Sequence, residues 1–200
     1  MPLLSQLATP FLTEAAFLPD GAAVFLDRDG VINRRRPDHV KSWSEFDFLP
    51  GTLDALASFH RIGARIVVVT NQAVVGRGLL SDADLAFIHA RMAGAVALAG
   101  GLIERTYACV HVPEMQCQCR KPGAALLMQA SAELGIRLEA SLMVGDALSD
   151  VQAARSAGCF PILVASDEEP GHRDGIAIVR QLSDVVTIYA QMRNRLVALC

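Results

Sequence analysis

Two aspartates one residue apart, Asp27 and Asp29, follow a short apolar run and stand directly before Gly30. Side chains two residues apart in an extended strand point to the same side, so both carboxylates can converge just beyond the strand end. Open α/β sheets bind ligands at the carboxyl ends of their strands. Two adjacent carboxylates repel unless a cation lies between them or one is protonated. The pair therefore suits metal and phosphate chemistry, or a division into nucleophile and acid/base; the alternative is a turn in which Asp and Gly serve backbone geometry only.

The composition indicates one globular domain. The chain has 200 residues, of which 52% are hydrophobic and 20% charged, and its net charge of −3 offers no general attraction for nucleic acid or an anionic membrane. We expect residues 1–20 to form an N-terminal extension and residues 21–200 a single domain. No apolar run approaches the roughly 18 residues that cross a bilayer, and the N-terminus lacks the pattern of a signal peptide. We therefore expect a cytoplasmic protein, acting as a monomer on a small molecule.

Apolar strand-like runs alternate with helical patterns, which predicts a mostly parallel sheet built from βαβ units. The expected strands are Ala22–Leu26, Arg65–Thr70, Thr106–Val110, Leu142–Val144, Phe160–Val164 and Ile176–Val179. The expected helices are Thr52–Arg61, Ser81–Ala99, Ala124–Leu134, Ser149–Ala157 and Ser183–Leu199. The long segment from Asn33 to Pro50 has no clear period, and loops of that size are often functional.

Polar residues follow each of the first four expected strands. Thr70-Asn71-Gln72 comes after the second, a cysteine cluster and then Arg120-Lys121 after the third, and Gly145-Asp146 with Asp150 after the fourth. Taken singly, Thr70 could simply end a strand, Lys121 could be solvated, and Asp146 or Asp150 could cap a helix. Their order at successive strand ends favours one shared site around the Asp27 and Asp29 pair.

Three cysteines and a histidine form a second candidate site. Cys109 and His111, separated by one residue, are followed after five intervening residues by Cys117 and Cys119 with the same spacing. Three thiolates and an imidazole suit tetrahedral Zn²⁺, and four protein ligands leave no open position, so the ion would be structural. The alternative is ordinary core cysteines beside a surface histidine. Such a zinc loop, residues 109–119, would fix its own end at Arg120 and Lys121.

These motifs resemble those of the haloacid dehalogenase-like phosphohydrolases. Asp27-Arg28-Asp29-Gly30 resembles the first motif of that family, Thr70 the second, Lys121 the third, and Gly145-Asp146 with Asp150 the fourth. Further strings, such as Arg77-Gly78 and Cys119-Arg120-Lys121-Pro122, resemble the branch that contains heptose 1,7-bisphosphate 7-phosphatases and histidinol-phosphatases. The resemblance implies a three-layer α/β/α, Rossmann-like fold with a short zinc-binding loop and no large cap domain.

The resemblance also implies roles for single residues. Asp27 would be the nucleophile that forms an aspartyl-phosphate, and Asp29 the general acid/base. Mg²⁺ would be held by Asp27, the Asp29 main-chain carbonyl and Asp146, with Asp150 in support. Thr70 and Lys121 would hold the transferred phosphoryl group. Asn71, Gln72, Arg77 and Arg120 would contact substrate, with Arg120 suited to a second phosphate.

The function implied is removal of the 7-phosphate of D-glycero-D-manno-heptose 1,7-bisphosphate, in heptose synthesis for lipopolysaccharide or capsule. Histidinol phosphate or another small sugar phosphate is the alternative substrate, and a polynucleotide 3′-phosphate ranks third. The alternative to an enzyme is a non-catalytic zinc-binding relative. The chain departs from the family pattern at Ala147, where a lysine is common, at Ala73-Val74 and at His39. The basic run Arg34-Arg35-Arg36 lies near the expected site and is equally compatible with a solvated turn.

Overall fold

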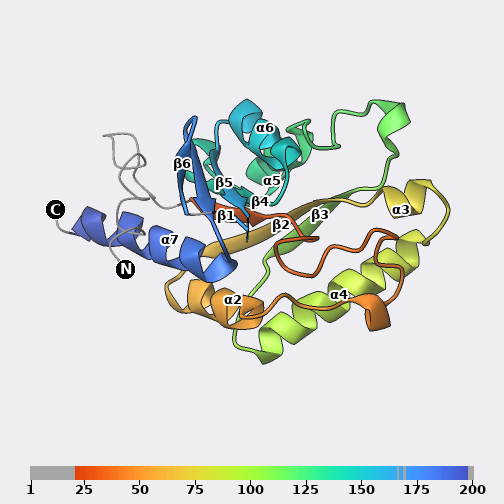
Figure 1. The fold of residues 1–200 in the computed structure, drawn as a ribbon, viewed down its shortest axis with the longest axis horizontal. Coiled ribbons are helices and arrows are strands. Elements are labelled where there is room, and N and C mark those ends of the chain that lie inside the picture. Colours follow the sequence, from red (N-terminus) through yellow and green to blue (C-terminus); the bar gives the residue numbers. More distant parts are fainter. Residues whose placement is uncertain (1–20, 166, 169, 198–200) are drawn as a thin grey trace.

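A computed structural model describes residues 21–165, 167–168 and 170–197 of the chain. They form a seven-stranded sheet with helices packed on both of its faces (Figure 1). The predicted three-layer α/β/α arrangement is therefore confirmed. All strands within the described ranges belong to this one sheet, so the fold has no large cap domain, as expected. The extension expected at residues 1–20 lies outside the described residues.

The sheet has the strand order β3-β2-β1-β4-β5-β7-β6. Six of its strands match the predicted ones to within about a residue at either end, and all of these run parallel to their neighbours. The exception is β6, an exposed edge strand antiparallel to β7, whose three residues carry no apolar pattern that could have predicted it. The strands are β1 (Ala23–Leu26), β2 (Arg65–Asn71), β3 (Arg105–Cys109), β4 (Leu142–Gly145), β5 (Phe160–Val164), β6 (Gly171–Arg173) and β7 (Ile176–Val179).

The longer helices also match the prediction, because their end signals operate as the sequence suggests. The Ser81 hydroxyl accepts a hydrogen bond from the Asp84 amide (3.0 Å) at the start of α4, and glycines in the left-handed conformation end α5 and α6. The helices are α2 (Thr52–Arg61), α3 (Ala73–Gly76), α4 (Asp82–Leu98), α5 (Ala125–Leu134), α6 (Leu148–Ala157) and α7 (Leu182–Val197), with short 3₁₀ turns η2 (Trp43–Glu45), η3 (Pro113–Met115) and η4 (Leu138–Ala140). No helix among the described residues is both long and apolar enough to span a membrane.

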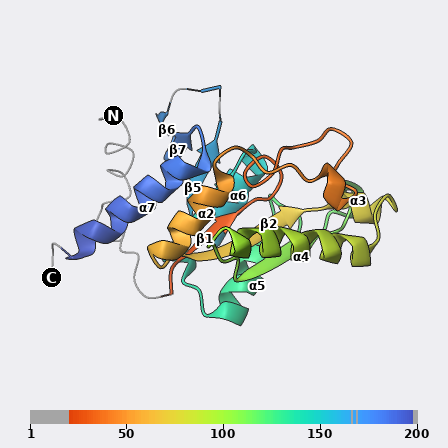
Figure 2. The same cartoon turned by 90° about the horizontal axis from the view of Figure 1, so that it is seen from below.

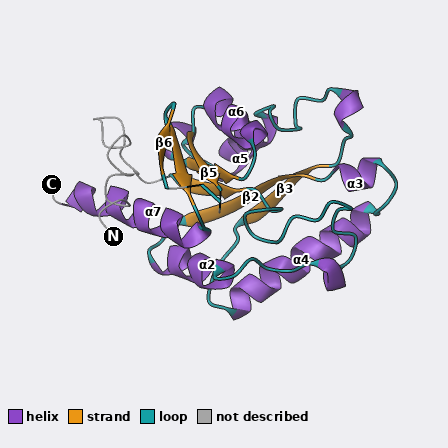
Figure 3. Ribbon diagram, viewed as in Figure 1, coloured by secondary structure: helices purple, strands orange, loops and turns teal. Residues whose placement is uncertain are grey.

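The sheet separates two apolar cores. Helices α2, α4 and α7 cover one face, and α5 and α6 cover the other (Figures 2 and 3). Strand β1 contributes to both, since Val24 and Leu26 belong to the first core while Ala23 and Phe25 belong to the second. This alternation is the period of two expected of a strand buried on both sides.

The strand order places the end of β1 at a natural binding position. β1 is flanked by β2 on one side and β4 on the other, so the chain crosses over in opposite directions from it. Crevices in open α/β sheets form at such switch points, beyond the carboxyl ends of the strands. The segment between β1 and α2 lies beside this edge and is held by packing of Trp43, Phe46 and Phe48, whose rings lie 5.0–6.2 Å apart.

Candidate active site

Asp27 and Asp29 face one cavity at the carboxyl edge of the sheet. Asp27 directly follows β1, and its amide donates to the Val144 carbonyl of β4 (2.9 Å), which fixes it between the two strands. The cavity has a volume of about 530 Å³. The convergence predicted from their spacing is thus present. The residues that line the cavity are Asp27, Asp29, Arg35, Arg36, Pro37, His39, Asn71, Arg120, Lys121, Ala147, Ser149 and Asp150.

Lys121 joins two of the carboxylates at the floor of this cavity. Its Nζ lies 2.9 Å from Asp27 Oδ1 and 2.5 Å from Asp150 Oδ1, and it also donates to the Val69 carbonyl (2.8 Å). Both Lys121 and Asp150 are almost completely buried. Burial alone would lower the pKa of Lys121, but the carboxylates of Asp27 and Asp150 outweigh it and raise that pKa. Lys121 is therefore a fixed positive charge beside the expected nucleophile.

Asp146 completes a group of three carboxylates that can hold a divalent cation. One oxygen each from Asp27, Asp146 and Asp150 lie within 4.8 Å of one another. Burial raises the pKa of Asp146 to about 6, an effect that Arg35 opposes and the other two carboxylates reinforce. Carboxylate oxygens are the ligands that Mg²⁺ prefers, and the concentration of negative charge here fits such an ion.

Two glycines let these carboxylates approach the backbone. A Cβ at Gly30 would lie 1.9 Å from Asp146 Oδ2, and a Cβ at Gly145 would lie 2.2 Å from the Asp150 carboxylate. Gly30 also has a left-handed φ of 94°. Gly30 of the first motif thus provides space for an acid of the fourth, and Gly145 provides space for Asp150 within the fourth motif.

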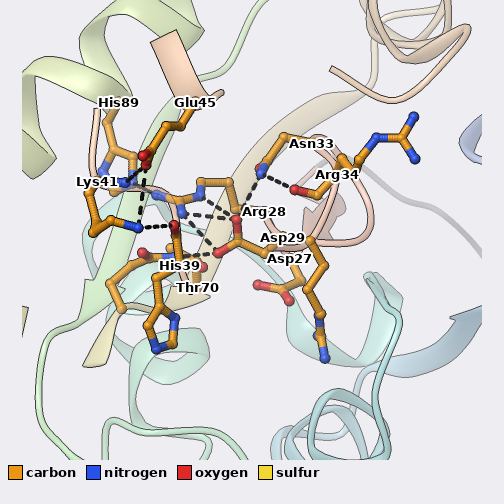
Figure 4. A network of polar contacts seen from close by, with 12 residues as sticks. Asp27, Arg28, Asp29, Asn33, Arg34, His39, Lys41, Glu45, Thr70 and His89 are labelled. Atoms are coloured by element: carbon orange, nitrogen blue, oxygen red, sulfur yellow. Dashed lines mark hydrogen bonds and ion pairs between the residues drawn. The ribbon is translucent and has the colours of Figure 1, made fainter. Parts of the chain in front are cut away.

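Asp29 is held by an unusually complete set of donors (Figure 4). Arg28 Nη2 lies 2.9 Å from both of its carboxylate oxygens, Asn33 Nδ2 donates to Oδ1 and Gln72 Nε2 to Oδ2 (each 2.8 Å). Burial would raise the pKa of Asp29, but the charge of Arg28 and these hydrogen bonds hold it below its usual value. The carboxyl is therefore ionised and fixed in orientation before any substrate binds.

Arg28 and His89 are functional candidates that the sequence reasoning missed. Arg28 is completely buried, its guanidinium lies 5.9 Å from the centre of the Phe46 ring, and its Nη1 donates to His89 Nε2 (3.2 Å). Burial, together with the charge of Arg28, lowers the pKa of His89 to about 4, so His89 is the neutral acceptor. The position of Arg28 between Asp27 and Asp29 is the sequence signal that could have identified it. Its side chain points to the face opposite to theirs, and other elements of the fold cover that face.

The residues after β2 have partners within the protein. Asn71 binds the Lys121 backbone twice, accepting from its amide and donating to its carbonyl (3.0 Å each). Gln72 is buried and also donates to the Thr70 hydroxyl (2.9 Å), and Thr70 itself is buried. Asn71 lines the cavity, whereas Thr70 and Gln72 are not among its lining residues. The side-chain amides of Asn71 and Gln72 thus bind Lys121 and Asp29, and the contact with substrate expected of both residues stays a prediction.

Arginines surround the open side of the cavity. Arg120 lines it, as predicted, and so do Arg35 and Arg36 of the basic run. Arg77 does not line it but donates to Nε2 of the lining residue His39 (2.7 Å). Arg35 reaches Asp146, with Nη2 2.5 Å from Oδ1. The three consecutive arginines beside the first motif were the only sequence signal for the Arg35–Asp146 ion pair. They do not reveal which of the three reaches Asp146.

The predicted zinc ligands are brought together in the loop after β3. The three sulfurs lie 3.2–3.5 Å apart, and His111 Nδ1 lies 3.1 Å from Cys119 Sγ. Zn–S bonds of about 2.3 Å in a tetrahedron separate sulfurs by about 3.8 Å, which is close to this spacing. One ligand atom from each of Cys109, His111, Cys117 and Cys119 lies within 4.8 Å of the others, so the cluster can hold a metal ion.

Comparison with known proteins identifies related phosphatases. Residues 118–184 match the HAD-hydrolase-like family. The chain is 40% identical over 141 residues to a D-glycero-β-D-manno-heptose-1,7-bisphosphate 7-phosphatase of Bordetella bronchiseptica, covering 70% of this chain and 79% of the relative. It is 38% identical over 157 residues to a D-glycero-α-D-manno-heptose-1,7-bisphosphate 7-phosphatase of Mycobacterium tuberculosis, covering 76% and 81%.

A solved structure supports the same relationship. The D,D-heptose 1,7-bisphosphate phosphatase of B. bronchiseptica, crystallised with magnesium and phosphate, superimposes with a TM-score of 0.78 at 34% sequence identity. The match covers 85% of this chain and 98% of the crystallised one. Relatives named for either anomer of the heptose thus match this chain at similar identity.

Proposed function

The chain belongs to the haloacid dehalogenase-like family of heptose 1,7-bisphosphate 7-phosphatases, and we propose that it removes the 7-phosphate of D-glycero-D-manno-heptose 1,7-bisphosphate. One observation carries the proposal: a single cavity combines Asp27, Asp29 and Lys121 on its floor with arginines on its open side. The floor suits attack on one phosphoryl group, and the arginines suit a second phosphate on the same small molecule. In this proposal the enzyme serves heptose synthesis for lipopolysaccharide or capsule.

In the first half-reaction, an oxygen of Asp27 attacks phosphorus and the sugar oxygen leaves. Lys121 lies beside Asp27 and balances the negative charge of the phosphoryl group. In this scheme the Thr70 hydroxyl, which accepts from Gln72, donates a hydrogen bond to a phosphoryl oxygen. Asp29 supplies a proton to the leaving oxygen. The resting Asp29 is ionised, so it takes this proton from solvent water as the doubly negative phosphate approaches and raises its pKa.

In the second half-reaction, Asp29 accepts a proton from the water that attacks the aspartyl-phosphate. Its ionised form suits this role, because the donors from Arg28, Asn33 and Gln72 keep the carboxylate in a fixed orientation. Asp150 does not contact substrate in this scheme. It holds Lys121 in place through their buried ion pair.

A bound Mg²⁺ would neutralise charge on the nucleophile and the phosphate. The carboxylates of Asp27 and Asp146 and the Asp29 main-chain carbonyl are the proposed ligands, and the proximity of the Asp146 and Asp27 oxygens supports that set. The cluster of Cys109, His111, Cys117 and Cys119 would hold a structural Zn²⁺. Because Arg120 and Lys121 directly follow Cys119, that ion would fix the start of the substrate-binding segment.

Histidinol phosphate fits the cavity less well than a bisphosphate. It carries a single phosphate and a cationic amine, and Arg35, Arg36 and Arg120 would repel that amine. A non-catalytic role also fits less well, since the nucleophile, acid/base and lysine of the family motifs all surround one cavity.

Side-by-side kinetics test the proposed function. Phosphate release with Mg²⁺ is measured on both anomers of heptose 1,7-bisphosphate, on heptose 7-phosphate and on histidinol phosphate. We expect the highest kcat/KM with a bisphosphate, and ³¹P NMR of the product to show that the 1-phosphate remains. Faster release from histidinol phosphate would contradict the proposal.

One variant sharpens the test of the second phosphate. Arg120→Gln is expected to raise KM for the bisphosphate about tenfold and to change KM for heptose 7-phosphate little, because only the bisphosphate offers a second anion. Arg61→Gln, an exposed arginine on α2, serves as the control.

A further inference from the structure

The three consecutive arginines after the first motif point in different directions. Arg34 pairs with Asp47 (3.0 Å) and Arg36 with Asp38 (3.2 Å), both within the same loop. Arg35, which lines the cavity, instead reaches Asp146 at the end of β4. Only the middle arginine therefore connects this loop to the carboxylates of the sheet edge.

Asp146 is held between the backbone and Arg35. One of its oxygens, Oδ2, packs against Gly30, where a Cβ would lie 1.9 Å away. The other, Oδ1, lies 2.5 Å from Arg35 Nη2. Lys121, the other nearby cation, is engaged by Asp27 and Asp150. Arg35 is thus the cation that Asp146 holds in this state.

The Arg35 pair is easy to break. Its side chain is 55% exposed, and Asp146 is its one hydrogen-bonding side-chain partner in the described part of the chain. Water screens a guanidinium this exposed, so the ion pair holds the Arg35 side chain only weakly. A divalent cation at the same carboxylate carries twice the charge and would repel the guanidinium.

We propose that Arg35 is a mobile counter-ion of Asp146, which Mg²⁺ displaces and which then binds a phosphate group of the substrate. The inference rests on the proposed function. Once displaced, Arg35 remains in the cavity that it lines together with Asp27, Lys121 and Arg120. Its planar guanidinium matches two phosphate oxygens.

Charge balance gives the displacement a direction. Asp27, Asp146 and Asp150 carry three negative charges, which Lys121 and a divalent ion would together neutralise. Arg35 is then surplus positive charge at the cavity, available to an incoming phosphate dianion. Mg²⁺ and phosphate should therefore bind cooperatively, each raising the affinity for the other by the same factor.

Calorimetric titration of Mg²⁺ without phosphate tests the first step. The protein with Arg35→Gln is expected to bind Mg²⁺ about two- to fivefold more tightly than the unaltered protein, because the competing cation is gone. Arg34→Gln is the matched control: it removes the same charge from the neighbouring residue, which pairs with Asp47 away from Asp146. Equal or weaker Mg²⁺ binding by Arg35→Gln, or the same gain in Arg34→Gln, would overturn the proposal.

Titration with inorganic phosphate tests the second step. With Mg²⁺ present, Arg35→Gln is expected to lose phosphate affinity about tenfold. Without Mg²⁺ the loss should be much smaller, since Arg35 is then engaged by Asp146. An equal loss of phosphate affinity with and without Mg²⁺ would overturn the proposal that Arg35 moves from Asp146 to phosphate. Neither titration requires turnover. If the protein fails to hydrolyse heptose bisphosphate, the proposed function is refuted, and the two titrations still test the proposal for Arg35 independently.

Discussion

The two candidate metal clusters of this chain are built in different ways. The carboxylates of Asp27, Asp146 and Asp150 come from the ends of β1 and β4 and the start of α6, while the ligands Cys109, His111, Cys117 and Cys119 lie within eleven residues. The first cluster is fixed by the hydrogen-bonded sheet and by buried Lys121. The second lies in a loop whose one regular element is the short turn η3. The sheet therefore organises the first cluster, whereas the second has little regular structure around it, and a bound ion would contribute more to its order.

The largest effect is expected from the carboxylate cluster. Asp27→Asn removes the nucleophile but keeps the size of the side chain, so Mg²⁺-dependent phosphate release should fall at least about a thousandfold. Asp47→Asn, an exposed acid of the neighbouring loop, is the control and should retain activity. Because the zinc loop is built independently, the zinc content of Asp27→Asn should stay unchanged. Retention of a tenth of the activity would exclude Asp27 as the nucleophile.

A smaller effect on rate and a larger one on stability are expected from the zinc loop. Cys117→Ser should reduce the zinc content from about one ion per chain and lower Tm by at least about 5 °C. Activity should fall in parallel, because Lys121 follows the loop directly. Gln118→Ser, an exposed neighbour between two ligands, should change neither. If Cys117→Ser kept both zinc and Tm, the two clusters would not differ as we infer.

The smallest effect is expected from His89, which contacts Arg28, the residue that holds Asp29 beside the carboxylate cluster. Its folded-state pKa of about 4 lies below the value of 6.5 for a free histidine, so the unfolded chain binds a proton that the folded chain does not. The stabilisation is complete above pH 6.5 and is lost as the pH falls toward 4, by at most about 3 kcal/mol.

Replacement of His89 measures this contribution. His89→Gln keeps an acceptor for Arg28 but cannot titrate, so its free energy of unfolding should fall less steeply between pH 6.5 and 4 than that of the unaltered protein. His60→Gln, at an exposed position of α2, is the control. Denaturant unfolding at several pH values gives the comparison, and identical slopes for the two variants would count against a buried, neutral His89.

The sequence alone predicted the parts of the site that depend on strand ends and local spacing. Asp27 and Asp146 each follow an apolar run, Lys121 follows the loop after a third, and parallel strands bring such ends to one edge. The cysteine and histidine ligands are close because they are close in the chain. Both kinds of proximity can be derived without knowing how side chains pack.

The partners of individual side chains could not be predicted. The bonds from the amides of Asn71 and Gln72 to Lys121 and Asp29 could not be read from the sequence, and their expected contact with substrate stays a prediction. Arg28 reaches His89, and Arg35 reaches Asp146, across large separations in the chain. Such pairs depend on the exact path of the loop between β1 and α2, for which the sequence has no periodic pattern.

Gly30 shows how one part of the chain restricts variation in another. Its left-handed backbone alone would tolerate asparagine, which adopts that conformation at modest cost. The contact that any Cβ would make with Asp146 removes this option. Evolution at position 30 is therefore limited by the acid at the end of β4, and a library of substitutions at Gly30 should yield active enzyme with glycine alone. Substitutions that merely preserve the turn would be eliminated by selection for activity.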